Sequence, residues 1–488
     1  MQNIIHMKNN LLETIAQNWK LEAKLETSRY FYHYTEVSAI LDNIKCFVIG
    51  RKGTGKTAIC NHIVNIKKYD CFSERLNFKN YPFNELYSLY NDRYTAPNQY
   101  ITLWKYLIYS SVCKLMSENE AIDSDVRKEL LKIYPKNNIK QLARRVSEWT
   151  SAEFGINVLG NGGNLKADRT ITNPQASISW LEKVNILEDI IANHCDESKY
   201  YIVFDELDED YRELSDNDTD VKLYKSLLTS LFKAVQDVKA TFSTTNLRIM
   251  PIVFLRDDIY ALLNDADKNK WSDFKIELEW TEDKIKKMIA YRISCDVNNG
   301  NSVLTFNNAW DRIFAHGKVR YGRNMSKKIS SFDFIARSTH MRPRDFIKYI
   351  QTCCVYAIER DENLISANTI KLVDRAFSNY LKGEIRDEVF PLLPEIESIF
   401  QIISNIRKQI FTGQEFSKEH KKYIDLGTVQ QRNSTYVLDI LFNFSVIGNE
   451  ERFHGGRHFF KYLHTNMTYN MEENIVLHRG LLKSLQII

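Results

Sequence analysis

The stretch CFVIGRKGTGKTAIC, residues 46–60, constrains the fold more than any other part of the sequence. Residues 46–49 form a short apolar run, which predicts a buried strand. The glycines that follow allow positive φ angles and a close approach of the backbone to another group. From Lys56 onward the apolar residues recur with the spacing of a helix. The sequence therefore predicts a strand, a glycine-rich loop and a helix in direct succession.

The spacing Gly-x-x-x-x-Gly-Lys-Thr over residues 50–57 matches the phosphate-binding loop, or Walker A motif, in full. Loop amides and the N-terminus of the next helix attract an anion. We expect Lys56 to reach the β- and γ-phosphates of ATP and the Thr57 hydroxyl to bind Mg²⁺. The residues expected to contact the nucleotide here are Gly50, Arg51, Lys52, Gly53, Thr54, Gly55, Lys56, Thr57 and Ala58. The alternative is a glycine turn that only joins the strand to the helix.

A second strand with carboxylates at its end is predicted by YYIVFDELDED, residues 200–210. Asp205 is expected to hold the Mg²⁺ shell, as a Walker B aspartate does. Glu206 is expected to polarise the attacking water, with Asp205 and Lys56 completing the catalytic set. The acids that continue the run, Asp208, Glu209 and Asp210, are predicted to form a solvated loop.

About 150 positions separate Lys56 from Asp205, far more than one strand–helix–strand unit requires. An insertion is therefore expected at about 84–180. Its pattern is mostly helical over 84–150, and alternation around the glycines at 162 and 163 predicts a β-hairpin. A helix over 179–195 is expected to lead back to the core.

A third strand, residues 249–255, ends at Arg256. Arg256 is either a sensor of the γ-phosphate, a surface charge, or a partner of Asp257. A further strand is predicted over 274–280, and the helix after it has Thr281 as its expected N-cap.

A later helix is predicted to begin at Pro343, which suits the first helical position. Arg342 and Arg344 stand at its start and are expected to lean over the nucleotide phosphates. They belong to the most basic part of the chain, because residues 316–348 hold nine Lys or Arg against two acids. This stretch is either a solvated face with the sensor residues or a contact for nucleic acid.

Together these motifs resemble the AAA+/STAND branch of P-loop ATPases. The stretches FVIGRKGTGKTAI, IVFDELDE, VFLRDDIY, RPRDFI and FNFSVIGN are similar to one bacterial family of such ATPases, from about Tyr30 to the end of the chain. The resemblance implies an α/β P-loop NTPase core, a parallel sheet flanked by helices, with a helical insertion, a helical lid and a C-terminal winged-helix domain. The implied cofactors are ATP and Mg²⁺.

The expected domains are an N-terminal helical segment at 1–29, the ATPase core at 30–280, the lid at 281–390 and the winged helix at 391–488. One departure from the family concerns the arginine finger of ring-forming members. The stretch before residue 274 offers only Lys268 and Lys270. This disfavours a motor ring and favours a switch or clamp.

The C-terminal part reads as three helices followed by strands, the order of a winged helix, a fold often used to read DNA. The third helix, within 434–444, is apolar around most of its circumference. Acidic and basic residues nearly balance from Leu393 onward, so phosphates are weakly attracted. We therefore expect this module mainly to pack against the core or a partner rather than to bind DNA.

Composition sets outer limits. The 488 residues are 44% hydrophobic and 26% charged, with a net charge of +4, which alone implies no nucleic-acid partner. Eight cysteines without a CxxC pair indicate free thiols in a reducing cytoplasm. The N-terminus does not resemble a signal peptide. No apolar run approaches the roughly 20 residues of a membrane helix, so we expect a cytoplasmic chain without a membrane partner.

Two functions stay open. The first is an ATP-binding and ATP-hydrolysing AAA+/STAND-like regulatory switch, which self-associates or engages an effector protein. Proteins that resemble this family occur near bacterial stress and antiphage loci. The alternative is a nucleic-acid-handling ATPase, an initiator, loader or remodeller, whose basic lid or winged helix contacts DNA. Origin-recognition ATPases are among the more distant relatives that the layout implies.

Overall fold

The computed structural model describes residues 11–79, 83–91, 93–135, 142–151, 179–208, 219–322, 324–451 and 456–487. The chain divides into two compact units. The core unit contains His33–Arg51 and Lys56–Leu278, and the C-terminal unit contains Met1–Tyr32, Lys52–Gly55 and Glu279–Ile488. The glycine-rich loop is thus shared, because its tip groups with the C-terminal unit.

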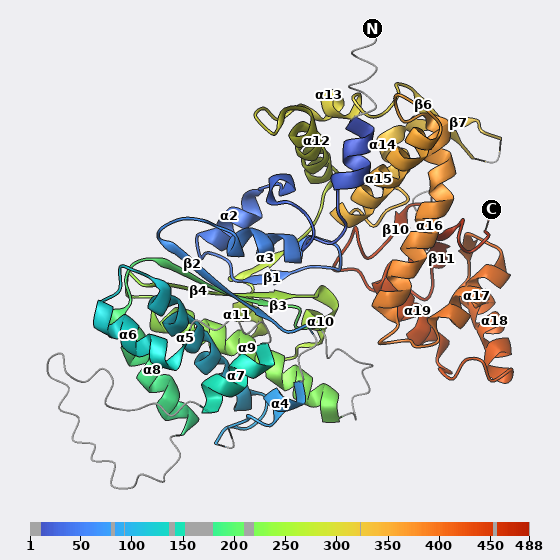
Figure 1. Ribbon diagram of the computed structural model, residues 1–488. Helices are drawn as coiled ribbons and strands as arrows, with labels where there is room; N and C mark the ends of the chain where they lie inside the picture. Colours follow the sequence, from blue (N-terminus) through green and yellow to red (C-terminus); the bar gives the residue numbers. More distant parts are fainter. Residues whose placement is uncertain are drawn as a thin grey trace. The chain divides into compact units, whose positions relative to one another are not determined.

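The core unit is built on a five-stranded parallel sheet with the order β2-β3-β4-β1-β5. The strands are β1 (Phe47–Ile49), β2 (Cys71–Asn77), β3 (Lys199–Asp205), β4 (Arg248–Leu255) and β5 (Lys275–Glu277). β3 and β4 are buried along nearly their whole length, as strands covered on both faces must be. Figure 1 shows α2 (Thr35–Leu41) and α3 (Lys56–Val64) on one face of this sheet and the longer helices on the other.

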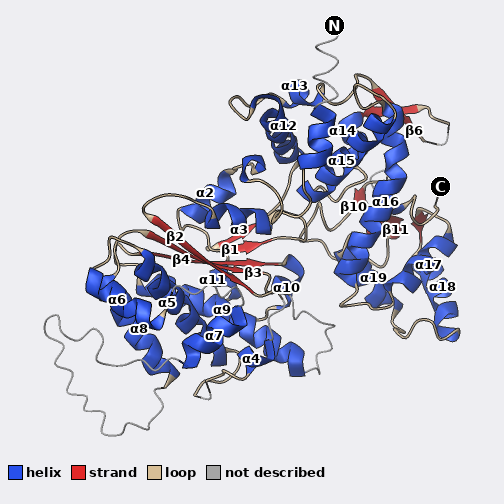
Figure 2. Ribbon diagram, viewed as in Figure 1, coloured by secondary structure: helices blue, strands red, loops and turns tan. Residues whose placement is uncertain are grey.

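The helices on the second face are α5 (Ile101–Glu118), α8 (Trp180–His194) and α9 (Thr219–Thr241). Smaller helices of this unit are α4 (Phe83–Tyr87), α6 (Ser124–Ile133), α7 (Leu142–Ser151), α10 (Asp257–Leu262) and α11 (Lys268–Trp271). The described part of the expected 84–180 insertion contains no strand, as Figure 2 shows. The hairpin expected around residues 162 and 163 lies outside the described residues.

The C-terminal unit begins with residues 11–18, which are helical. Its lid region contains α12 (Glu282–Asn298), α13 (Phe306–Trp310), α14 (Ser331–Ala336), α15 (Pro343–Glu359) and α16 (Ala367–Val389). The Thr281 side chain accepts a hydrogen bond from the Lys284 amide, so the predicted N-cap of α12 is confirmed. Pro343 is the first residue of α15, as predicted.

The lid also contains a two-stranded antiparallel hairpin, β6 (Lys318–Tyr321) and β7 (Lys327–Ser330). This hairpin was not predicted from the sequence, and the rest of the lid is helical as expected. Val319 is buried and pairs with Ile329, so alternation places an apolar side of the hairpin against the lid helices.

The last part of this unit has the order of a winged helix. Helices α17 (Ile396–Ile406), α18 (Gly413–Asp425) and α19 (Ser434–Asn443) accompany a four-stranded sheet, β10-β9-β11-β8. Its strands are β8 (Ile410–Phe411), β9 (Ile447–Glu450), β10 (His458–Phe459) and β11 (Asn474–Leu477). The first helix was expected over residues 395–411 but ends at Ile406, because Ile410–Phe411 pairs with β11 instead of continuing the helix.

The winged helix packs against the lid within the C-terminal unit. The Arg479 guanidinium donates hydrogen bonds of 3.1 and 3.2 Å to Asp374 of α16, and the Ser484 amide donates to the Ser378 hydroxyl at 2.9 Å. A Cβ on Gly480 would lie 2.2 Å from the Ser338 carbonyl oxygen, so only glycine permits this approach. The module therefore packs against the lid, whereas the prediction named the core or a partner as its packing surface.

These observations confirm the predicted fold class: a P-loop α/β core with a parallel sheet, helical regions and a C-terminal winged helix. All eight cysteines are free thiols, as the lack of paired spacing predicted. Within the described residues no helix is long and apolar enough to cross a membrane.

Candidate functional site: the carboxyl edge of the parallel sheet

The order of the strands gathers the predicted core residues at one edge of the sheet. β4 lies between β1 and β3, and all three run in the same direction. The glycine-rich loop follows β1, Asp205 ends β3, and Arg256 follows β4. In open α/β sheets ligands bind at the carboxyl ends of the strands, so this edge is the candidate site.

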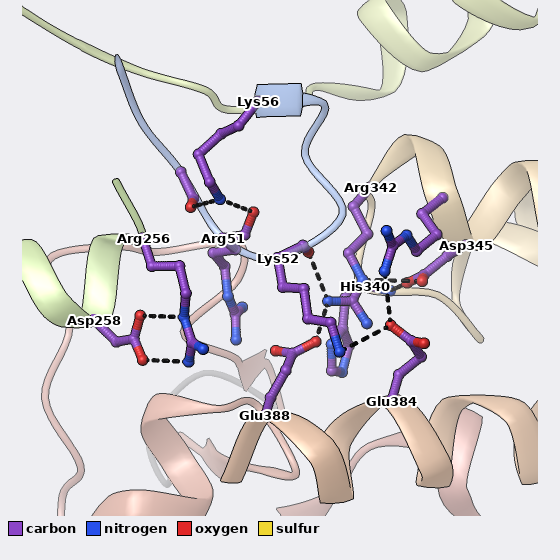
Figure 3. Close-up of polar contacts among 12 residues, drawn as sticks. Arg51, Lys52, Lys56, Arg256, Asp258, His340, Arg342, Asp345, Glu384 and Glu388 are labelled. Carbon is purple, nitrogen blue, oxygen red and sulfur yellow. Dashed lines mark hydrogen bonds and ion pairs between the residues drawn. The ribbon is translucent and has the colours of Figure 1, made fainter. Parts of the chain in front are cut away.

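Lys56 is the first residue of α3, and its ammonium group is turned back onto the loop (Figure 3). It donates to the carbonyl oxygens of Gly50 at 2.6 Å and Arg51 at 3.0 Å. Burial lowers the pKa of Lys56, while Asp208 and Asp257 act in the opposite direction. The cation is therefore held over the loop, where it can exchange carbonyl oxygens for phosphate oxygens.

Two glycines of the loop have positive φ angles that other residue types rarely adopt. Gly53 has φ +82° and Gly55 has φ +101°, a region that L side chains rarely adopt. Gly53 also lacks room, because a Cβ there would lie 3.2 Å from both Arg342 Cδ and Arg344 Cβ. The glycine pattern thus has a conformational cause in this structure.

Asp205 is buried at the end of β3, with 3% of the residue exposed. Its carboxylate forms an ion pair with Arg75 of β2, and Arg75 also donates to the Asn61 side chain of α3 at 2.9 Å. Burial raises the pKa of Asp205, Arg75 opposes this rise, and Glu206 adds to it. Arg75 thus supplies the positive charge that a buried carboxylate requires.

Glu206 has φ +59°, the left-handed region, directly after the strand. A non-glycine residue held there is uncommon and marks turns and functional sites. Its neighbour Asp208 was expected in a solvated loop. Its side chain is 38% exposed, which agrees with that expectation, and its carboxylate lies 3.6 Å from Arg256; Glu209 and Asp210 lie outside the described residues.

The Arg256 side chain forms ion pairs with two acids, Asp208 and Asp258. Its Nε and Nη2 donate to the Asp258 carboxylate at 3.0 and 2.6 Å, as Figure 3 shows. The hypothesis of a pair with Asp257 is therefore wrong, and Asp258 is the partner. Burial raises the pKa of Asp257, which Arg51 counteracts. A cation so close to the end of β4 is placed to respond to a charge at the sheet edge.

The tip of the loop has its own contacts within the C-terminal unit. The Arg342 guanidinium donates to the Lys52 carbonyl oxygen at 2.8 Å, and the Lys52 ammonium lies 3.6 Å from Glu384 of α16. Arg344 donates to Glu384 at 3.2 Å. Of the two predicted sensor arginines, Arg342 therefore contacts the loop backbone, and Arg344 lies beside Gly53.

Arg342 is also the centre of a buried ionic network. Its side chain is 2% exposed, and it donates to Asp345 at 2.9 Å and to Glu388 at 2.7 Å. Burial opposes the charged form, but Asp345 and Glu388 raise the pKa of Arg342 above its ordinary value. Asp345 additionally accepts the His340 amide at 2.9 Å. Arg342 therefore contributes to the stability of the lid, whatever else it does.

The residues fit a magnesium ion of the kind that P-loop proteins use. Thr57 lies in the first turn of α3 and Asp205 ends β3, and a hydroxyl with a carboxylate suits this hard cation. Magnesium usually takes its remaining ligands from phosphates and water. No cluster of three or more His, Cys, Asp or Glu that could hold a metal occurs among the described residues, and such a Mg²⁺ site needs none.

Arg75 and Asn61 are the site residues that the sequence analysis missed. Their signal was weak, because strand β2 reads CFSERLN, with Glu74 and Arg75 side by side. Successive residues of a strand face opposite sides, so Arg75 reaches Asp205 whereas Glu74 pairs with Lys114 and Arg145. A strand holding both charges cannot be recognised by apolar alternation alone.

Comparison with known proteins gives one matching family model, the FunZ-associated C-terminal helical domain, over residues 283–386. The search of curated proteins gives no match. Similar solved structures include Cdc6p from Pyrobaculum aerophilum, at 12% identity and a TM-score of 0.31, covering 94% of this chain and 96% of that one.

Two others are from Aeropyrum pernix. ORC2, in ADPNP–ADP complexes, has 11% identity and a TM-score of 0.38 and covers 92% of this chain and 89% of that one. ORC1, in complex with DNA, has 10% identity and a TM-score of 0.34 and covers 98% of this chain and 96% of that one. The family match thus covers the lid helices α12 to α16, and these structural likenesses are distant.

Proposed function

We propose that this chain binds ATP with Mg²⁺ and hydrolyses it, and that it works as a nucleotide-gated regulatory switch. One observation carries the proposal. The strand order places a complete Walker A loop, the Asp205–Glu206 pair and Arg256 at the same edge of one parallel sheet. A turn that only connected strand to helix would need none of these partners.

The roles follow from the positions. The amides of residues 50–58 and the α3 N-terminus hold the phosphates, and Lys56 neutralises the β- and γ-phosphates. Thr57 and Asp205 would hold Mg²⁺, which supplies charge neutralisation between the phosphates. Glu206 accepts the proton of the attacking water. Arg256, Arg342 and Arg344 respond to the presence of the γ-phosphate.

The polar contacts at this edge of the sheet support regulated rather than rapid turnover. Lys56 is bonded to loop carbonyls and Asp205 to Arg75, so both groups must leave existing partners before they act. The Lys52 carbonyl oxygen and ammonium group also have existing partners, Arg342 and Glu384, which they must leave if the loop tip moves. Each of these exchanges couples binding of ATP to a local rearrangement.

We place the switch in a bacterial defence or stress-response assembly, formed by self-association or with an effector protein. The sequence resemblance is the support for this setting. A nucleic-acid-handling ATPase is the second candidate, and the cations of the lid hairpin favour it.

The deciding experiment measures the molar mass of the chain by light scattering with and without ATP. The Glu206→Gln variant traps the ATP-bound state, and the series is repeated with a DNA duplex. ATP-dependent assembly without DNA supports the switch. Hydrolysis that requires DNA supports the second candidate. The absence of ATP binding by the wild-type chain would overturn both.

A further inference from the structure

The structure divides the most basic part of the chain into two groups of cations. Arg337 stacks on the ring of Tyr321, with its guanidinium carbon 3.9 Å from the ring centroid, and Arg342 is buried in its ionic network. Arg344 pairs with Glu384. These arginines are committed to the fold. The cations of the β6–β7 hairpin are not.

Four exposed cations lie on the hairpin: Lys318, Arg320, Lys327 and Lys328. Among the described residues, none of their side chains has a hydrogen bond or an ion pair. Some exposed lysines elsewhere do pair with an acid one turn away, for example Lys128, Lys132 and Lys287. The hairpin charges therefore have no structural partner that would account for them.

Strand register puts three of these cations on one face. Arg320 lies directly opposite Lys328, and Lys318 lies two residues from Arg320 on the same strand. The other face carries Val319, which is buried, and Ile329, its cross-strand partner. Like charges directly opposite one another destabilise a hairpin, so the Arg320–Lys328 pair lowers the stability of this one.

The spacing and shape suit a polyanion. Residues two apart on a strand are separated by roughly 6.6 Å, about the rise of two nucleotides along a duplex strand. The hairpin lies at the end of α16 and protrudes from the lid, as Figure 1 shows. Its aromatic residue, Tyr321, is covered by Arg337, so it offers no stacking platform for unpaired bases.

We propose that the outer face of the β6–β7 hairpin, defined by Lys318, Arg320 and Lys328, binds the phosphodiester backbone of a nucleic-acid duplex. Lysine and arginine contacts to phosphates position a protein without reading sequence. Binding at this surface is accordingly independent of base sequence and strongly dependent on salt. It does not require the proposed ATPase activity.

The test is fluorescence anisotropy of the full chain with a 30-base-pair mixed-sequence DNA duplex, without nucleotide. Three neutralised phosphates give a salt slope of about −2.7, or about a forty-fold loss of affinity from 50 to 200 mM salt. The triple variant Lys318→Ala, Arg320→Ala, Lys328→Ala is expected to remove that part of the slope. The charge-matched triple Lys128→Ala, Lys132→Ala, Lys287→Ala is expected to keep it.

Three further measurements separate loss of charge from loss of folding and DNA from RNA. Lys328→Ala alone should lower the slope by about 0.9 if the triple variant proves unstable. The variant Lys318→Arg, Arg320→Lys, Lys328→Arg keeps the charges and should keep the slope. An RNA duplex of the same sequence separates the two sources of phosphodiester, and binding of either one supports the proposal.

Three outcomes overturn it: binding of neither duplex, an unchanged slope in the hairpin triple, or an equal loss in the charge-matched triple. Binding of phosphatidylserine vesicles or polyglutamate in place of both duplexes would also overturn it. Repeating the titration with Lys56→Ala separates this surface from the nucleotide site, because the hairpin binding is expected to persist there.

Discussion

Lys56 is the residue on which nucleotide binding depends most directly. Lys56→Ala removes the cation that meets the phosphates and leaves the loop glycines in place. We expect no measurable ATP binding by calorimetric titration. Lys67→Ala is the matched control, because Lys67 is exposed and lies beyond the last residue of the same helix. An unchanged ATP affinity in Lys56→Ala would contradict the assignment.

Glu206 should separate binding from hydrolysis. Glu206→Gln keeps the size of the side chain but cannot accept the proton of water, so turnover should fall by roughly two or more orders of magnitude. ATP affinity should stay near the wild-type value. Glu197→Gln, an exposed change before the opposite end of β3, should leave turnover unchanged. Wild-type turnover in Glu206→Gln would point to Asp208 as the activating carboxylate.

Arg75 should control the protonation of Asp205. Burial already raises the pKa of Asp205 in the folded state, and Arg75→Met removes the charge that opposes this rise. A carboxyl whose pKa is raised on folding binds more protons when folded, so stability falls as pH rises above its unfolded value of about 3.9. The variant should lose thermal stability relative to wild type between pH 4.5 and 8.

The size of this loss should approach the roughly 3–5 kcal/mol typical of a broken buried pair. Adding Asp205→Asn removes the carboxylate and should restore stability and abolish the extra pH dependence. Arg75→Lys keeps the charge and should behave more like wild type. A pH profile parallel to wild type in Arg75→Met would exclude this coupling.

At the scale of elements, the features predicted correctly from the sequence are those that neighbouring residues determine. The caps of α12 and α15 were recognised because Thr281 and Pro343 are placed by rules that need only neighbouring residues. The loop after β1 was recognised for the same reason. Strand β2 was missed, since the burial of its charges depends on Asp205 and Lys114, which are distant in sequence. Tertiary partners of this kind leave no local pattern.

The lid hairpin was missed for a related reason. Its strands are short, and exposed cations interrupt their apolar residues, so the stretch reads as a solvated face. The distinction between committed and free cations appears only when Arg337 and Arg342 are seen with their partners. The sequence could thus indicate an excess of charge but not which cations are available.

Helix α15 has consequences for testing the sensors. Arg342→Ala leaves Asp345 and Glu388 buried without their cation, so we expect a loss of stability of about 3–5 kcal/mol. Arg256 and Arg344 have partly exposed partners, so their alanine variants should fold. These two should reduce the preference for ATP over ADP by about tenfold, the usual effect of one charged hydrogen bond. Calorimetry with both nucleotides measures it, and normal preference, hydrolysis and assembly in both variants would exclude the sensor role.

At the scale of the whole molecule, the winged helix and the lid hairpin offer different surfaces to a nucleic acid. α19 buries Val437, Leu441 and Phe442, and its exposed residues include Asp439. A recognition helix needs polar and basic side chains toward the groove. The buried side of α19 therefore serves packing, and the Arg479–Asp374 pair ties this module to α16.

Arg432, exposed just before α19, is the cation that could make this module a DNA reader. Arg432→Glu reverses its charge, and in the full chain we expect the duplex affinity and its salt slope to stay within about twofold of wild type. The reason is that acidic and basic residues nearly balance in this module and the exposed face of α19 carries an acid, so phosphates are weakly attracted there. Anisotropy with the same duplex checks this, beside the hairpin triple as the positive control. Loss of salt-sensitive binding in Arg432→Glu, with binding retained in the hairpin triple, would move the nucleic-acid contact to the winged helix and favour the second candidate function.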